Sequence, residues 1–251
     1  MERPRIVSRD EWLAERRQHL ANEKRLTRLY DQLAAERRRL PWVKLEKSYV
    51  FEGPNGQESL SDLFGDRSQL IVNHFMLGPG WQQGCVGCSF GADHVEGALV
   101  HLAQKDVSYV AVSRAPLPEI EAFQKRMGWS FKWVSSNGSD FNYDFSVSFT
   151  KEQLAAGRGF YNFEETKPYS EELPGTSVFA KDESGAIFHT YSAFGRGMES
   201  ILGTYVLLDV TPKGRDETGP SQNLTDWVRH HDAYAGTGSV EPTGRLRPTT
   251  H

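Results

Sequence analysis

The sequence predicts an α/β protein, more specifically a three-layer α/β/α sandwich with a mixed sheet. Between residues 69 and 136, apolar runs typical of buried strands alternate with segments of helical periodicity, an order that joins parallel strands through helices. A strand–turn–strand pattern at 176–192 then adds an antiparallel hairpin. Because 38% of the 251 residues are apolar and 12% are aromatic, the chain can fill a sizeable core.

A charge-rich segment, residues 9–39, precedes the sandwich. Ser8 and Glu11 form the capping pattern that opens a helix, and Pro41 ends it. The apolar stripe of this helix is narrow and its other faces carry mixed charges, which indicates a solvated helix that docks on the domain or on a second subunit. We therefore expect residues 1–41 to form a helical extension, through which two copies of the chain can pair as a homodimer.

The first half of the sandwich begins with two strands around the turn sequence GPNG, within residues 42–64. A mostly apolar run at 69–77 is typical of a buried central strand. Val95 and Leu102 share an apolar helical face, and we expect that helix to begin at or near Cys85.

The second half continues the alternation and ends in a polar tail. The expected elements, in chain order, are a strand at 107–114, a helix at 116–128, a strand at 131–136, an aromatic-rich loop, a short helix at 151–157, an irregular stretch at 158–173, the hairpin at 176–192 and a last helix at 198–209. Beyond Thr211 the chain becomes polar and rich in Gly, Pro and Thr. We therefore expect a domain over residues 42–211 and a tail over 212–251, with its final dozen residues disordered.

Charge and hydropathy argue against several classes of function. The net charge of −4 and the pI near 6.1 give no bias toward nucleic acid or an anionic membrane. No run of 18 apolar residues is present, and the N-terminal residues lack the apolar core of a secretory signal. We expect a cytoplasmic protein that binds neither nucleic acid nor membrane, and a reducing compartment disfavours a static disulfide.

Both cysteines of the chain lie in the stretch WQQGCVGCSF, separated by two residues. Cys85 follows a buried strand and opens a helix, where unpaired N–H groups and the helix dipole stabilise a thiolate. Cys88 lies one turn further along and can attack a mixed disulfide formed on Cys85. The pattern predicts a redox-active pair with Cys85 as the nucleophile and Cys88 as the resolving thiol, and this chemistry needs no cofactor.

Two other interpretations of the pair stay open. Copper or zinc could be held by Cys85, Cys88 and a nearby histidine, in a metal-binding protein or a metal-dependent oxidase, although a structural zinc site usually needs four Cys or His ligands. His74 on the central strand and His94 on the following helix are candidate metal ligands, or candidate acid/base groups for the thiols. Each is also an ordinary core or helix-surface residue. The cysteines could instead be inert core residues in a non-catalytic interaction module.

Residues 49–90 resemble the start of thioredoxin-like proteins of the peroxiredoxin and TlpA type, with a strand, a glycine turn, a hydrophobic strand and a helix that begins with cysteine. Nearly the whole chain, from about residue 10 to about residue 235, resembles a bacterial family of predicted dithiol-disulfide oxidoreductases, catalogued as a domain of unknown function. The matching segments are LPWVKLEKSYVF, GCVGCSFGADH, VAVSRAPLPEIEAFQKRMGW, WVSSNGSDFNYDFSVSFT, ELPGTSVFAKDESGAIFHTYS, LLDVTPKGRDE and DWVRHHDAY. The resemblance implies a thioredoxin-like fold and a thiol or disulfide substrate, either a protein or a small molecule.

The resemblance also implies a substrate-binding edge. Thioredoxin-like folds place a cis-proline before the strand that faces the cysteines, and Pro174 followed by Gly175 offers that position, with an ordinary trans turn proline as the alternative. Trp81 either covers the site or packs beside it. Two departures are visible: Gly84 replaces the aromatic residue that precedes the first cysteine in thioredoxins, and Trp81 stands where peroxiredoxins carry threonine. Without that threonine, a peroxide-reducing role is disfavoured.

Overall fold

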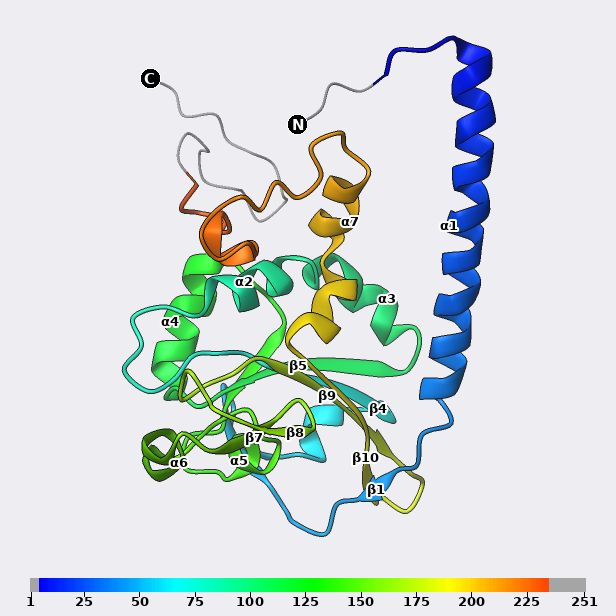
Figure 1. The fold of residues 1–251 in the computed structure, drawn as a ribbon. Helices are drawn as coiled ribbons and strands as arrows, with labels where there is room; N and C mark the ends of the chain where they lie inside the picture. The colour runs from blue at the N-terminus through cyan, green and yellow to red at the C-terminus, as the bar shows by residue number, and fades with distance from the viewer. Residues whose placement is uncertain (1–4, 235–251) are drawn as a thin grey trace. The chain divides into compact units, whose positions relative to one another are not determined.

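The computed structural model describes residues 5–234, and the chain divides after Pro41 into two compact units. The first unit contains the helix α1 (Arg9–Arg37), which is drawn in blue in Figure 1. Ser8 caps α1, since its hydroxyl accepts from the Glu11 amide while the Glu11 carboxylate accepts from the Ser8 amide at 2.9 Å. The predicted N-terminal helix is confirmed, and none of its residues is buried.

An eight-stranded mixed sheet forms the centre of the second unit, in the order β1-β10-β9-β4-β5-β6-β2-β3. Its strands are β1 (Val43–Lys44), β2 (Val50–Gly53), β3 (Gly56–Ser59), β4 (Gln69–His74), β5 (Val107–Ser113), β6 (Lys132–Ser135), β9 (Gly175–Lys181) and β10 (Ile187–Phe194). Strands β4, β5 and β6 run parallel, and β9 joins them antiparallel as part of the predicted β9–β10 hairpin. A separate small sheet pairs β7 with β8, and its strands are β7 (Gly159–Tyr161) and β8 (Glu164–Thr166).

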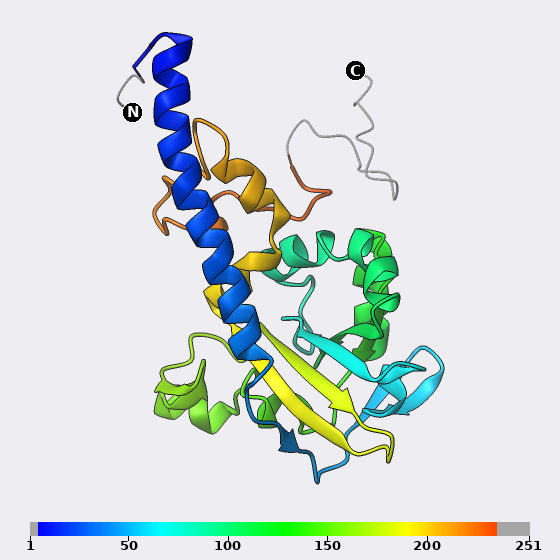
Figure 2. The same ribbon diagram turned by 90° about the vertical axis from the view of Figure 1, so that its right-hand side faces the viewer.

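Helices lie on both sides of the large sheet. They are η1 (Asp62–Phe64), α2 (Val86–Asp93), η2 (Glu96–Ala98), α3 (Leu99–Ala103), α4 (Leu117–Met127), α5 (Phe141–Asp144), α6 (Lys151–Ala156), η3 (Gly195–Ile201), α7 (Gly203–Asp209) and η4 (Leu224–Asp226). Figure 1 shows α2, α3 and α4 on one side and α5 and α6 on the other, and in Figure 2 the β9–β10 hairpin faces the viewer. The predicted class, a three-layer α/β sandwich with a mixed sheet, is confirmed, and its elements follow the order that the resemblance to thioredoxin-like proteins implies.

The side chains of β5 show how the sheet separates two cores. Val110 and Val112 join one buried cluster, whereas Ala111 between them joins the other, because successive side chains of a strand point to opposite faces. The first cluster includes Phe141 from α5, and the second includes Cys88 from α2. The cysteine pair therefore belongs to the face that α2 and α4 cover.

Two helices that the sequence predicts as continuous are broken. The helix after the cysteines ends at His94, whose Nδ1 lies 2.6 Å from the Phe90 carbonyl oxygen, and it resumes as η2 and α3. Glu96 begins η2, and its side-chain carboxylate accepts from the Ser130 amide at 2.6 Å. The last helix divides into η3 and α7 at Leu202, which packs into a buried cluster with residues of α2 and α7. Both breaks arise from long-range contacts, which helical periodicity does not report.

Three further differences concern the strands and the tail. The expected strand at the start of residues 42–64 divides into β1, which pairs with β10, and β2, which pairs with β3 and β6. The stretch at 158–173, predicted as irregular, contains β7 and β8. The disorder predicted for the final dozen residues lies outside the described residues. Among residues 5–234, no helix combines the length and apolar character needed to cross a membrane.

Candidate active site

The two cysteines lie where the connection after β4 enters α2. Cys85 is the residue just before the helix, with an extended backbone (φ −57°, ψ 134°), and its amide donates to the Met76 carbonyl at 3.0 Å. Cys85 is partly exposed, whereas Cys88 in the first turn is buried. This arrangement places the Cys85 thiol beside the free N–H groups that begin the helix.

The two thiols share a hydrogen bond that shifts their pKa values in opposite directions. The Cys88 thiol and the amides of Cys88 and Gly87 donate to the Cys85 sulfur, and they lower the pKa of Cys85 to about 6 against the opposing effect of burial. The same shared hydrogen bond, followed by burial, raises the pKa of Cys88 above its usual range. Near neutral pH the pair therefore holds a thiolate on Cys85 and a proton on Cys88.

Gly84, directly before Cys85, lies against two buried aromatic rings. A Cβ atom at Gly84 would lie 2.4 Å from Phe75 Cε1 and 2.8 Å from Phe123 Cε1. Both rings belong to the tightly packed cluster under α2, so a side chain here would have to displace a core ring. This contact explains why glycine, and not an aromatic residue, precedes the cysteine.

We expect Gly84→Ala to lower the free energy of unfolding by about 1–3 kcal/mol, the usual cost of overpacking a core. Gly87→Ala is the matched control, because a Cβ there would meet Leu224 Cδ1 at 3.2 Å and Cys85 Sγ at 3.8 Å. Urea denaturation followed by circular dichroism measures both variants. An equal loss of stability in the two would contradict the special constraint at Gly84.

Trp81 is tied to the loop that precedes β9. Its indole Nε1 donates to Glu171 Oε1 at 3.1 Å. The neighbouring Glu172 is buried, and it accepts from Arg114 Nε at 2.5 Å and from Ser148 Oγ at 2.6 Å. Trp81 also packs against the core cluster that contains the cysteines. The loops after β4, after β5 and before β9 are therefore fastened together at this end of the sheet.

Of the two forms left open for Pro174, the structure has trans and not cis, because the described residues contain no cis peptide bond. Trans is the lower-energy form of an X-Pro bond, and the Pro174 carbonyl accepts from Tyr161 Oη at 2.7 Å. Gly175 is buried, begins β9 and pairs with His74 of β4. Substrate binding by Trp81, Pro174 and Gly175 stays a prediction.

His74 lies on the sheet face opposite the cysteines. Its ring stacks on Phe145 of the other core cluster with centroids 5.9 Å apart, and Nε2 lies 2.9 Å from Ser177 Oγ. Burial lowers the pKa of His74 to about 3, so the ring is neutral near pH 7. The next residue, Phe75, points to the cysteine side. The structure therefore does not bring His74 to the pair.

His94 joins α2 to α7. Its Nε2 accepts from the Thr204 amide at 3.0 Å, and its Nδ1 lies 2.6 Å from the Phe90 carbonyl oxygen. Because the Thr204 amide donates to Nε2, that nitrogen acts as an acceptor, and Nδ1 faces the Phe90 carbonyl oxygen as the donor. Both nitrogens are thus engaged away from the thiols. Within residues 5–234, no three His, Cys, Asp or Glu side chains are arranged to hold a metal ion.

Three tyrosines lie within electrostatic range of the pair. Burial raises the pKa of Tyr109 and Tyr161, and the charge of Cys88 adds to this effect. Desolvation, followed by the charges of both cysteines, raises the pKa of Tyr169, whose side chain is nevertheless largely exposed. Tyr161 and Tyr169 belong to the segment that contains β7 and β8, so this segment borders the site. No local pattern marks these tyrosines.

The C-terminal residues also reach the site, although the sequence suggests a mobile region around His230 and His231. His230 is buried, and its Nε2 lies 2.9 Å from the Gly84 carbonyl oxygen. The signal that could have found this contact is the apolar pair Trp227 and Val228 within an otherwise polar tail. Such a pair indicates an anchor on the domain.

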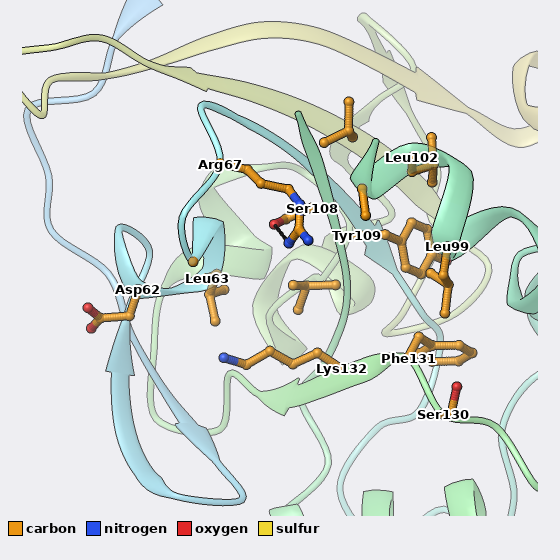
Figure 3. Close-up of a pocket in the computed structure, with 14 residues that line it drawn as sticks. Asp62, Leu63, Arg67, Leu99, Leu102, Ser108, Tyr109, Ser130, Phe131 and Lys132 are labelled. Atoms are coloured by element: carbon orange, nitrogen blue, oxygen red, sulfur yellow. Dashed lines mark hydrogen bonds between the residues drawn. The ribbon is translucent and has the colours of Figure 1, made fainter. Parts of the chain in front are cut away.

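A cavity of about 320 Å³ lies away from the cysteines, at the start of β5 (Figure 3). Because β4 and β5 run parallel, this end of the sheet is opposite the end where β4 leads to Cys85. Tyr109 and Phe131 form part of its apolar wall, and Arg67 and Lys132 lie on its polar side. Lys132 is already paired with Glu58, and Arg67 Nη1 donates to a serine hydroxyl at 3.3 Å. The cavity is not part of the thiol site.

Comparison with known proteins places the chain in a family. Similar solved structures include peroxidoxin BcpB of Mycobacterium tuberculosis (13% identity, 66% of this chain and 94% of that chain, TM-score 0.42) and peroxiredoxin Q of Xanthomonas campestris (13%, 63% and 90%, TM-score 0.42). A candidate protein disulfide isomerase of Bacteroides thetaiotaomicron is another (16%, 66% and 90%, TM-score 0.38). A comparison with curated proteins gave no match. The model of DUF899, described as a bacterial protein of unknown function, matches residues 1–234. The chain therefore belongs to this bacterial family, as its sequence resemblance indicates.

Proposed function

We propose that the protein is a thiol-disulfide oxidoreductase that works through Cys85 and Cys88. The observation that supports this function is the difference between the two thiols. Cys85 is partly exposed and has a pKa lowered to about 6, whereas Cys88 is buried and its pKa is raised. A thiolate that a substrate can reach is the attacking group in disulfide exchange, and a protonated thiol beside it can act second.

The reaction takes two exchange steps. The Cys85 thiolate attacks a substrate disulfide R–S–S–R′, a mixed disulfide forms between Cys85 and the R–S group, and R′–S⁻ leaves. Cys88 then gives up its proton to that leaving thiolate or to water, and its sulfur attacks the Cys85 sulfur and releases R–S⁻. The pair loses two electrons and becomes a disulfide, while the substrate disulfide gains the same two electrons and becomes two thiols.

The partners of this reaction follow from its chemistry. The oxidised pair needs a thiol reductant, such as a thioredoxin or a low-molecular-weight thiol, to return to the dithiol form. A reducing compartment such as the cytoplasm would supply that reductant. Leu20, Leu26 and Leu33 are exposed on α1, which supports the pairing of two copies through this helix as part of the proposal.

Mass spectrometry and metal analysis of protein purified without chelator test this function. We expect oxidation to remove the mass of two hydrogens, to map to Cys85 and Cys88, and to be reversed by a reductant. Stoichiometric copper or zinc that blocks thiol alkylation would replace the proposal with a metal-binding function. Thiols that neither oxidise nor bind metal would indicate a non-catalytic interaction module.

The pH dependence of alkylation tests the choice of nucleophile. Because only the thiolate reacts, the rate at which iodoacetamide modifies Cys85 should rise with pH through an inflection near 6. In protein unfolded by urea the inflection should move to about 8.5, the usual value for a cysteine. Peptide mapping assigns the modified residue. The same inflection in folded and unfolded protein would contradict the assignment.

A further inference from the structure

The C-terminal segment, defined here as Asn223–Tyr234, packs along the turn that carries the cysteines. Val228 is fully buried in a cluster with Phe90 of α2, and Val86, one of the two residues between the cysteines, packs against this cluster. Leu224 approaches Gly87, the other intervening residue, with Cδ1 3.2 Å from where a Cβ would stand. The segment therefore approaches Gly87 directly and shares an apolar cluster with Val86.

His230 of this segment contacts the residue just before Cys85. The residue is 3% exposed, and its ring lies edge to face on Phe123 with centroids 5.5 Å apart and places Nε2 2.9 Å from the Gly84 carbonyl oxygen. Since a carbonyl oxygen only accepts, Nε2 carries a proton and donates. A buried N–H donor that loses its acceptor costs free energy. The hydrogen bond therefore holds the His230 ring and the Gly84 carbonyl group in place.

The neighbours of His230 fasten the segment on both sides. His231 Nδ1 lies 2.7 Å from Asp93 Oδ1 at the end of α2. Arg126 of α4 binds Asp232 through two nitrogens, at 2.8 and 3.0 Å, in the bidentate geometry that makes such pairs specific. The position of His230 thus does not depend on its own hydrogen bond alone.

We propose that His230 is a positioning residue of the redox site, which holds the Gly84–Cys85 peptide group so that the Cys85 sulfur meets the amides of Gly87 and Cys88. The two polar atoms of that peptide group are both engaged: the Gly84 carbonyl accepts from His230, and the Cys85 amide donates to Met76 at 3.0 Å. This positioning role rests on the proposed function in one respect, namely that Cys85 is the reacting thiol.

The need for such a residue follows from Gly84. The core rings beside it exclude a Cβ, and glycine leaves the backbone before the cysteine free to rotate. The stabilisation of the Cys85 thiolate comes from the Cys88 thiol and from two amides, and no lysine or arginine of the described residues contributes to it. Tyr161 and Tyr169 also interact electrostatically with the pair, and a tyrosine side chain carries no positive charge. Thiolate stability at Cys85 therefore depends on orientation, which a peptide rotation would change.

Substitutions at His230 test this role through the alkylation profile of Cys85, which needs no redox substrate. In His230→Ala we expect the inflection of that profile to rise by about one pH unit, so that Cys85 reacts about tenfold more slowly at pH 5. In His230→Gln the amide nitrogen reaches the place of Nε2, and we expect a rate within about twofold of the parent protein. His231→Ala is the matched control, because it removes the neighbouring histidine and its bond to Asp93 and leaves the Gly84 contact.

Two comparisons decide the outcome. A folded His230→Ala protein that reacts like His231→Ala would overturn the proposal. If His230→Ala does not fold, His230→Asn against His230→Gln gives the answer, since both carry an amide but only the longer side chain reaches Gly84. Equal reactivity of the Asn and Gln variants would overturn the role as well. Failure of the redox function would appear separately, as a pair that never forms a disulfide while the effect of His230 on alkylation persists.

Discussion

Cys85→Ser is expected to abolish disulfide exchange, with a loss of rate on the order of a thousandfold or more. Serine preserves the size of the side chain, but its hydroxyl does not ionise near neutral pH and cannot form a mixed disulfide. The measurement is the initial rate at which the reduced protein cleaves a small aromatic disulfide, followed by the absorbance of the released thiol. A rate close to that of the parent protein would exclude Cys85 as the nucleophile.

Cys88→Ser is the matched variant, because it removes the second thiol and keeps the first. We expect one round of attack and a stable mixed disulfide on Cys85, seen by mass as a single added substrate thiol. The pKa of Cys85 should also rise in this variant, since the shared hydrogen bond is the largest cause of its lowering. A mixed disulfide that forms on Cys88 when Cys85 is replaced, and not in Cys88→Ser, would reverse the two roles.

Arg114→Ala is expected to lower the free energy of unfolding by about 3–5 kcal/mol at pH 7, the cost of breaking a buried ion pair. The carboxylate of Glu172 is 3% exposed on its side chain and would lose the Arg114 guanidinium that lies 2.5 Å away. Arg158→Ala is the control: Arg158 pairs with Glu165 at 3.4 Å, but both side chains are largely exposed, so its loss should cost less than about 1 kcal/mol. Urea denaturation measures both.

The loss in Arg114→Ala should depend on pH in a definite direction. Burial raises the pKa of Glu172, while Ser148 and Arg114 lower it, so removal of Arg114 raises it further. A carboxyl group with a raised pKa in the folded state favours the folded state at low pH and loses this contribution as the pH rises. The difference between Arg114→Ala and the parent protein should therefore shrink from pH 7 to pH 5. A difference that does not change with pH would contradict a charged Glu172 as its cause.

Local patterns were enough to predict the sheet and the thiol pair. The apolar runs of β4 and β5 define the central strands, because a strand that is buried on both faces, as at Val110, Ala111 and Val112, is apolar at successive positions. The position of the cysteine pair is also visible in the local sequence, since the first turn of a helix supplies its own N–H groups to a thiolate. These features depend on residues that are neighbours in the chain.

The remainder of the site depends on residues that are far apart in the chain. The contact of Arg114 with Glu172, the approach of Tyr169 to the cysteines and the place of His230 each join separate loops, so no spacing in the sequence reports them. The face of the sheet toward which each β4 side chain points likewise decides that His74 contacts the other core, although it lies only eleven residues before Cys85. The broken helix after His94 has the same origin, because the break is made by contacts with other segments.

The hydrogen bond between His230 and Gly84 spans 146 residues, and this separation affects how the site is made. During synthesis the cysteine turn leaves the ribosome long before residue 230, and domains fold as their segments emerge. A contact of such long range forms late, after the chain between its ends has been ordered. On the positioning role proposed for His230, a nascent chain would therefore carry Cys85 as a weakly reactive thiol and acquire its reactive thiolate only when the final segment is in place.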